Sequence, residues 1–207
     1  MAWISRDCCG VNLDLFSALA VFAFVTSVTP GPNNLMLMAS GANFGFRLTI
    51  PHMLGIGLGF TFMVVLVGIG LMQLFDAFPV SYTILKVVSV VYLTWLAWKI
   101  ATAGEPGTGK AGGTPMTFLQ AAAFQWVNPK AWAMALTAIT AYAPTRDLSA
   151  VLFVALVFGA VNLPTVSVWT VLGQQIKRVL TNPVRLRLFN GTMAALLMAS
   201  LYPVVFS

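Results

Sequence analysis

The stretch TPGPNN, at residues Thr29–Asn34, interrupts a long uncharged segment and decides the fold of this chain. A second proline-containing stretch, QWVNPK, occupies residues Gln125–Lys130, so that Pro129 lies 99 positions after Pro30 (129 − 30). A proline inside a helix removes a backbone hydrogen bond and displaces the preceding residue from helical geometry. Within a membrane, such irregular backbone persists only where protein buries it or where it lines a water-filled cavity. The two stretches therefore predict two broken helices, nearly half a chain apart.

The composition indicates a membrane protein. Of the 207 residues, 59% are apolar and only 8% are charged, and the mean hydropathy is +0.89. A soluble domain carries about 25% charged residues. Residues 15–46, 48–75, 148–176 and 188–207 contain no charged side chain, and an uncharged apolar run of about 18 residues or more is typical of a transmembrane helix. Soluble enzymes, nucleic-acid-binding proteins and disulfide-rich secreted domains are therefore excluded.

Cutting the chain at charged residues and Gly/Pro clusters predicts an all-α membrane protein with six transmembrane helices. Their approximate positions are 15–38, 48–72, 79–100, 117–141, 149–172 and 186–206. At a rise of 1.5 Å per residue, about 20 residues cross a hydrocarbon core of about 30 Å. Residues 105–116, rich in Gly, Thr and Pro, are predicted to be a cytoplasmic linker between a three-helix repeat at 1–104 and a second one at 117–207. Because three helices precede the linker, the second repeat starts from the opposite face. The two repeats are then inverted, with helices 1 and 4 broken.

The distribution of Lys and Arg predicts the orientation of the bundle. The face that holds both termini carries at most three basic residues, Arg6, Lys86 and Arg146. The other face carries seven, which are Arg47, Lys99, Lys110, Lys177, Arg178, Arg185 and Arg187. Because cytoplasmic loops hold an excess of Lys and Arg, we expect a multi-pass protein of the bacterial inner (plasma) membrane with both termini in the periplasm.

Lys130 marks the expected functional centre. It lies near the middle of the fourth helix, where a lysine costs about 2.5–3.5 kcal/mol on insertion scales. We expect its side chain to point into a polar cavity where the two breaks meet, with the ring of Trp126 available to a cation. Proline-interrupted segments at matching positions of two repeats indicate a transport site near the membrane midplane. Two other interpretations stay open: the prolines are simple kinks, or Lys130 is a fixed internal strut.

The expected substrate pathway comprises Thr29, Pro30, Gly31, Pro32, Asn33, Asn34, Gln125, Trp126, Asn128, Pro129, Lys130 and Asn162. Asn162, just before Pro164 in the fifth helix, either lines the pathway or bonds one helix to another. We interpret His52, at the start of the second helix, as a residue of the membrane interface. Gly55 and Gly59 have the small-xxx-small spacing of closely packed membrane helices.

The motifs together resemble the lysine-exporter (LysE/RhtB) type of amino-acid translocator. The resemblance rests on Pro-Gly-Pro-Asn at Pro30–Asn33, Asn-Pro-Lys-Ala at Asn128–Ala131, Leu85-Lys86, Tyr92–Leu96 and the glycines 55, 57 and 59. It covers essentially the whole chain. It implies a small bacterial inner-membrane exporter of amino acids or close derivatives, driven by the proton motive force. Many members of that type carry an acidic residue in the fifth helix, where this chain has Asn162.

We therefore expect a secondary-active exporter that binds an amino acid within a lipid bilayer, with a homo-oligomer as an open possibility. A neutral amino acid fits the lack of acidic groups near the midplane better than lysine or arginine does. The main alternative is a passive channel or an ion or metal exporter of similar size. A metal site calls for carboxylate, His or Cys ligands, which the midplane does not supply, so neither a metal nor a cofactor is expected. An intramembrane enzyme is not expected either, since the chain has a single His and no H-E-x-x-H pair.

Overall fold

The computed structural model describes residues 13–103, 114–143, 147–178, 180 and 182–202. Every regular element within these ranges is helical, which confirms the all-α prediction for this part of the chain. In chain order the elements are α1 (Leu13–Val28), α2 (Pro32–Phe44), α3 (Phe46–Leu66), η1 (Val67–Leu71), α4 (Met72–Ala77), α5 (Val80–Ala101), α6 (Phe118–Phe124), η2 (Gln125–Val127), α7 (Pro129–Tyr142), α8 (Leu148–Lys177) and α9 (Pro183–Ala199). Predictions that concern Arg6, Lys110, Arg146 and linker residues 105–113 lie outside the described residues.

Three helical segments among the described residues are long and apolar enough to cross a membrane. They are Phe46–Leu71, Val80–Ala101 and Leu148–Lys177, with 26, 22 and 30 residues. A fourth candidate is the pair α1 and α2, which passes the same test as one span bent by 55°. Apart from the two breaks, all six predicted intervals are largely helical over their described parts, but α9 has only 17 residues and the fourth interval consists of shorter helices. The six-helix inverted arrangement thus stays a prediction.

Both predicted breaks are present, and local chemistry explains where each new helix begins. Gly31 is extended (φ −174°, ψ 178°) and α2 starts at Pro32. At the second break, α7 likewise starts at a proline, Pro129. Here the Asn128 side chain also accepts a hydrogen bond of 3.2 Å from the Lys130 backbone N–H. Proline suits the first position of a helix because its missing N–H would be unpaired there and its φ is already helical. The same residues that end one helix therefore begin the next.

The fifth predicted helix is longer than expected. α8 begins after Asp147, whose side chain accepts a 2.9 Å hydrogen bond from the Ala150 N–H, and it continues without interruption through Pro164 to Lys177. A proline can remain inside a membrane helix where neighbouring groups satisfy the freed carbonyl. This proline does not produce a third break.

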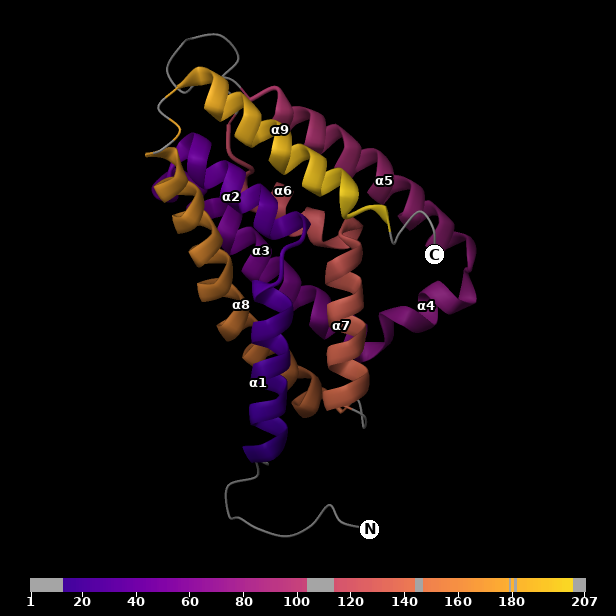
Figure 1. Cartoon of the computed structure of the whole chain (residues 1–207). Helices are drawn as coiled ribbons and strands as arrows, with labels where there is room; N and C mark the ends of the chain where they lie inside the picture. The colour runs from indigo at the N-terminus through magenta and orange to yellow at the C-terminus, as the bar shows by residue number, and fades with distance from the viewer. Residues whose placement is uncertain (1–12, 104–113, 144–146, 179, 181, 203–207) are drawn as a thin grey trace.

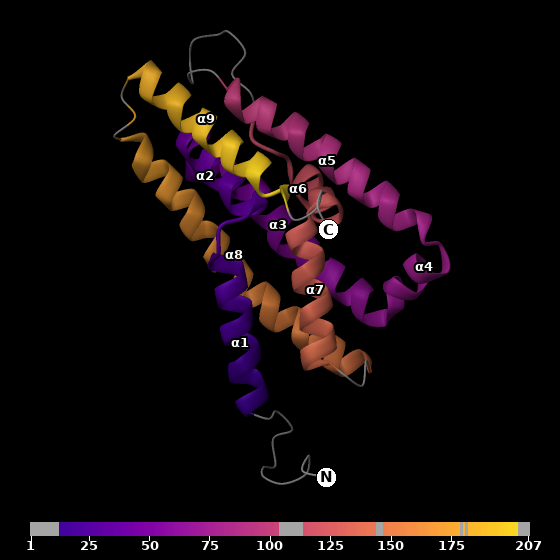
Figure 2. The same cartoon turned by 45° about the vertical axis from the view of Figure 1, so that its right-hand side comes forward.

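The helices are arranged so that α8 runs along both members of the broken pair. Figures 1 and 2 show α8 beside α1 and α2, and α5 beside α9. α3 packs against α8 on one side and α6 on the other. The largest apolar cluster lies between α1, α3, α7 and α8 and includes Phe60, Met63, Ala135 and Phe158. The centre of the bundle is therefore built by helices from both halves of the chain.

Glycines allow two of these helix pairs to touch closely. A β-carbon on Gly55 would lie 2.4 Å from the Phe118 carbonyl oxygen, and one on Gly59 would lie 2.6 Å from the Ala122 Cα. The predicted packing role of these two glycines is confirmed. The contact between α2 and α8 is closer still, because a β-carbon on Gly173 would lie 2.0 Å from the Met38 carbonyl oxygen. Small residues let membrane helices approach in this way.

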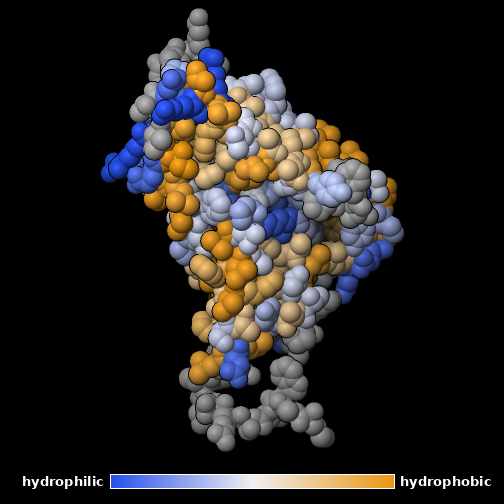
Figure 3. Space-filling view, viewed as in Figure 1, coloured by the Kyte–Doolittle hydropathy of each residue, from blue (hydrophilic) through white to orange (hydrophobic). Residues whose placement is uncertain are grey.

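The outer surface is largely apolar, and α5 shows this most clearly. Its exposed large side chains are Val80, Tyr82, Ile84, Val87, Val88, Val91, Trp95 and Trp98. In Figure 3 the hydrophilic residues gather near the ends of the molecule and in one patch at mid-height, with apolar residues between them. This distribution suits a protein surrounded by lipid tails.

Candidate functional site

The two broken helices meet, and Lys130 joins them. Its ammonium Nζ donates to the carbonyl oxygen of Thr29 and lies 3.5 Å from the carbonyl oxygen of Pro30. These carbonyls belong to the break between α1 and α2, while Lys130 is the second residue of α7. The predicted approach of Lys130 to the first break is therefore present. The hydrophilic patch at mid-height in Figure 3 lies where α1 ends and α7 begins in Figure 1.

A pair of amide side chains forms a second link between the breaks. Asn33 Nδ2 donates to Gln125 Oε1 at 2.9 Å, and Gln125 Nε2 donates back to Asn33 Oδ1 at 3.2 Å. Gln125 Nε2 also donates to the Ala121 carbonyl at 2.9 Å, and the residue is completely buried. Because each amide satisfies the other, this link holds α2 against η2 without leaving a buried polar group unpaired.

The carbonyls at the breaks are satisfied by side chains as well as by backbone. Asn34 Nδ2 donates to the carbonyls of Ser27 (2.8 Å) and Thr29 (2.9 Å), which closes the end of α1. At the other break, the Asn128 N–H donates to the Gln125 carbonyl at 3.3 Å. The asparagines next to the prolines thus replace part of the hydrogen bonding that the prolines remove.

A small cavity lies between the two breaks. About 20 Å³ of it is open to the centre of a water-sized sphere, and a cavity needs only about 10–15 Å³ by this measure to hold one water molecule. Its lining residues come from α1, α2, α3, α7, α8 and the two breaks; they are Thr26, Ser27, Gly31, Asn33, Asn34, Phe60, Asn128, Lys130, Ala131, Met134, Asn162 and Val166. In this conformation the cavity has room for water but not for an amino acid.

Asn162 carries the one polar atom of this lining that is buried without a hydrogen-bond partner. Its Nδ2 donates to Ser27 Oγ at 3.3 Å, and its Oδ1 is buried and unpaired among the described residues. The sequence left open whether Asn162 bonds one helix to another or lines the pathway. The two interpretations apply to the nitrogen and the oxygen of the same amide. The nitrogen connects α8 to α1, and the oxygen is an unpaired acceptor on a residue that lines the cavity.

Trp126 has a different position from the one expected. Its ring packs against Phe62 and Trp132, with centroid distances of 6.4 and 6.0 Å, and its carbonyl accepts a 2.8 Å hydrogen bond from Trp132 Nε1. Trp126 is not among the residues that line the cavity. The expectation that its ring lies on the same helix face as Lys130, available to a cation, assumed an unbroken helical register, and the 3-10 turn η2 at Gln125–Val127 changes that register.

Several features of the polar residues in the bundle were not anticipated from the sequence. Ser27 lines the cavity and bonds Asn162, yet a serine in an apolar helix carries no distinctive pattern. His52, at the start of the second predicted helix, is buried within the protein, with 2% of its surface exposed. Asn43 Nδ2 donates to Asn190 Oδ1 at 3.0 Å, which ties α2 to α9. Only the pairing of helices in space reveals these partners.

Comparison with known proteins identifies the family. A family model described as "LysE type translocator" matches residues 24–200. The chain belongs to this family. The resemblance noted in the sequence is thereby confirmed, and this LysE type protein is a transporter rather than an enzyme, integral to a membrane.

Curated relatives are named for their cargo. The cysteine/O-acetylserine efflux protein of Escherichia coli (strain K12) is 29% identical over 167 residues, which cover 80% of this chain and 85% of that protein. The proteins of the same name from Shigella flexneri and from Escherichia coli O1:K1 / APEC have the same identity and coverage. No solved structure matches the chain.

Proposed function

We propose that this LysE type protein exports small neutral amino acids or close derivatives across the bacterial inner membrane as a secondary transporter driven by the proton motive force. The substrate binds where the two breaks meet. The observation that carries the proposal is the contact of Lys130 Nζ with the carbonyls of Thr29 and Pro30, about a hundred residues away in sequence. Because the ammonium group lies beside the cavity, a ligand that binds there can pair with it or displace it from the two carbonyls.

The groups around the cavity suit the two ends of a zwitterion. The N-termini of α2 and α7 both begin at the breaks, and helix N-termini favour a carboxylate. The unpaired Asn162 Oδ1 and the Thr29 carbonyl are acceptors for an ammonium group. Among the described lining residues there is no acidic side chain, so a cationic side chain on the substrate would have no counter-ion here. The relatives named for cysteine and O-acetylserine support the same class, a short uncharged side chain.

A pair of contacts between α3 and α8 supports the inverted repeat. A β-carbon on Gly57 would lie 3.3 Å from Leu163 Cδ1, and one on Gly159 would lie 2.5 Å from Thr61 Oγ1. Adding 102 to the α3 residue of each contact gives the α8 residue of the other contact, because 57 + 102 = 159 and 61 + 102 = 163. Two contacts that exchange under one shift are the pattern that a two-fold axis between equivalent helices produces. The shift is close to the 99 residues that separate Pro30 from Pro129, in keeping with repeats at 1–104 and 117–207.

The positive charges support an orientation in which one end of the bundle faces the cytoplasm. Arg47 lines a groove with Gln174 near the end of α8, and Lys99 lies in the last turn of α5. The end of the molecule that holds these two residues, together with Lys177, Arg178, Arg185 and Arg187, is called the basic end below. By the positive-inside rule the basic end faces the cytoplasm, which leaves both termini in the periplasm. The substrate then enters through the basic end and leaves through the opposite one.

Efflux from cells and reconstituted vesicles tests the proposal. Lys130→Met is expected to abolish efflux of radiolabelled O-acetylserine or cysteine while the protein stays in the membrane, and Lys130→Arg to retain part of it. Normal efflux by Lys130→Met would remove the central assignment. Dissipating the proton gradient with a protonophore should stop efflux against a concentration gradient. Flux that follows only the substrate gradient, with no response to the protonophore, would instead support the passive channel.

A further inference from the structure

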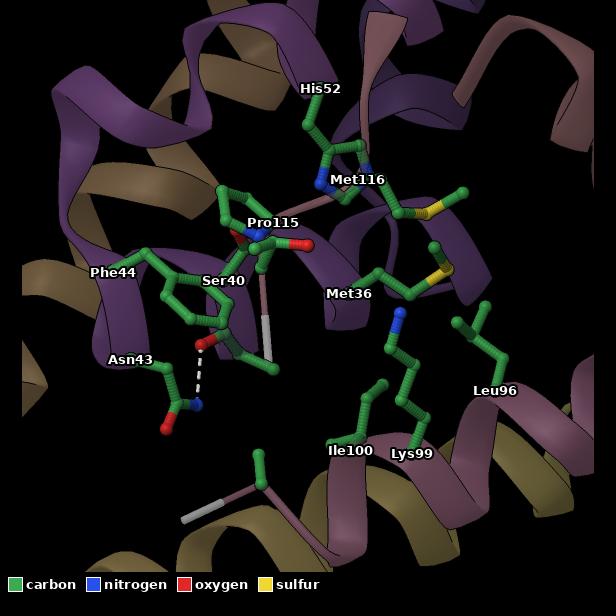
Figure 4. Close-up of a pocket in the computed structure, with 13 residues that line it drawn as sticks. Met36, Ser40, Asn43, Phe44, His52, Leu96, Lys99, Ile100, Pro115 and Met116 are labelled. Atoms are coloured by element: carbon green, nitrogen blue, oxygen red, sulfur yellow. Dashed lines mark hydrogen bonds between the residues drawn. The ribbon is translucent and has the colours of Figure 1, made fainter. Parts of the chain in front are cut away.

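A second cavity lies at the basic end, apart from the breaks. About 70 Å³ of it is open to the centre of a water-sized sphere, more than three times the volume between the breaks. Figure 4 shows side chains of α2, α3, α5 and residues 114–116 around it. α2 contributes to both cavities, with Asn33 and Asn34 at the breaks and Met36 and Ser40 here. One helix therefore connects the two sites.

His52 is the unusual feature of this cavity. Only 2% of its surface is exposed, and neither ring nitrogen has a hydrogen-bond partner among the described residues. Figure 4 shows the ring directed into the cavity. A buried polar group without a partner is costly, and each one in a native structure calls for an explanation. A neutral imidazole offers one donor and one acceptor, so a ligand that fits it carries both an acceptor and a donor.

The buried polar side chains that α2 contributes to the lining are already bonded to the protein. Ser40 Oγ and Thr49 Oγ1 share a 2.9 Å hydrogen bond. Asn43 Nδ2 donates to the Ala39 carbonyl at 2.8 Å and to Asn190 Oδ1. These groups therefore give the cavity a fixed polar wall. The two ring nitrogens of His52 are the buried side-chain nitrogens of the lining that have no partner among the described residues.

Lys99 gives the cavity a charge. The residue is half-buried, and its Nζ lies 5.3 Å from the centroid of the Trp95 ring. Figure 4 shows its ammonium turned toward Met36. A positive charge on the lining of the same cavity repels metal ions and favours a carboxylate. The remaining wall is apolar, formed by Met36, Leu96, Ile100 and Met116, which leaves room for a short uncharged side chain.

From these features we propose that the cavity is a second binding site for an amino acid with a short uncharged side chain, occupied on the cytoplasmic side before the substrate reaches the breaks. Its carboxylate pairs with Lys99, and its ammonium group donates to a ring nitrogen of His52. The inference rests on the proposed function, because it assigns the same cargo to an earlier position on the route. It adds that each chain holds two substrate sites, joined by α2.

Protection of single cysteines from alkylation tests the two sites separately. The full chain, with Cys8 and Cys9 replaced by serine, receives either Met116→Cys at the second cavity or Met134→Cys at the breaks, and is placed in liposomes. O-acetylserine should slow the reaction of N-ethylmaleimide several-fold at both positions. His52→Leu, which replaces the imidazole with an apolar side chain, should remove protection at position 116 and keep it at 134. Lys130→Met should have the reverse effect, and His52→Gln, which keeps a donor and an acceptor, should retain part of the protection at 116.

The outcomes separate this inference from the proposed function. Protection at position 134 but not at 116, with efflux intact, would overturn the second site and leave the exporter standing. Absence of protection at both positions together with absence of efflux would overturn both. If position 116 reacts slowly in liposomes and quickly in detergent, whether or not O-acetylserine is present, then lipid fills the cavity and the inference is wrong.

Discussion

Lys130 lies directly over Gly31, so closely that a β-carbon at residue 31 would come within 2.6 Å of Lys130 Cδ and 3.1 Å of its Nζ. The backbone of Gly31 is extended, a conformation that any residue adopts. Glycine is therefore required here by the neighbouring lysine and not by its own φ and ψ. The path of the Lys130 side chain from α7 to the Thr29 carbonyl depends on the absence of a side chain at residue 31.

Gly31→Ala should therefore disable transport without unfolding the protein. The flexible lysine side chain can move away from the new methyl group, but its ammonium then loses the two carbonyls. A hydrogen bond to a charged group is worth about 1.5–3 kcal/mol, so efflux is expected to fall about tenfold or more. The measurement is the initial efflux rate at matched membrane abundance. Gly191→Ala is the control, because a β-carbon there meets nothing within 4 Å. Equal rates for the two variants would contradict the positioning role of Gly31.

The reciprocal amides Asn33 and Gln125 should show measurable coupling. Removing either side chain takes from the other amide the two hydrogen bonds of the pair. The losses of stability in the two single alanine variants should therefore add up to more than the loss in the double variant. Polar pairs between membrane helices couple by about 0.6 kcal/mol on average and by about 1.7 at most. A double-mutant cycle of Asn33→Ala and Gln125→Ala, followed by unfolding in a detergent mixture, gives this value. Strict additivity would mean that the two amides do not stabilise the contact between the breaks.

The contacts at the breaks could be anticipated from the sequence, because proline chemistry fixes where a helix stops and Lys130 has no route to water from there. Apart from the two breaks, each predicted interval is largely helical over its described part for the same reason: uncharged apolar runs leave the backbone no alternative within lipid. Trp126 was misplaced because a 3-10 turn altered its register. The depth of His52 and the contact of Gly173 with Met38 could not be predicted, since both depend on which helices are neighbours.

Asn162 should affect substrate affinity more than stability. Its Oδ1 is unpaired in the folded protein, so Asn162→Leu removes no hydrogen bond at that atom and loses only the 3.3 Å bond from Nδ2 to Ser27. We expect the KM for efflux to rise about tenfold, as for one lost hydrogen bond to a charged ammonium group. Ser27→Ala is the matched control, because it removes the same interhelical bond and leaves Oδ1 in place. A similar KM for both variants would show that Oδ1 does not contact the substrate.

The contact of α2 with α8 should hold the two helices together at the basic end. A β-carbon on Gly173 would lie 2.0 Å from the Met38 carbonyl oxygen, and one on Gly41 would lie 2.2 Å from that of Thr170. Backbone cannot yield as a side chain does, so Gly173→Ala must separate the two helices. Gly57→Ala is the graded control, since its neighbour at 3.3 Å is the flexible end of Leu163.

Gly173→Ala is expected to lower the free energy of unfolding by about 1–3 kcal/mol, the usual cost of overpacking, and Gly57→Ala by less. If α2 and α8 separate when the basic end opens, Gly173→Ala should also favour the open state. The measurement combines thermal unfolding with maleimide labelling of Met38→Cys, in a chain without Cys8 and Cys9, from the cytoplasmic side of inverted vesicles. Faster labelling in the Gly173→Ala background than in the Gly57→Ala background would identify this contact as the part that opens. Unchanged labelling, with only stability lost, would restrict the glycine contact to packing and assign the opening to another pair of helices.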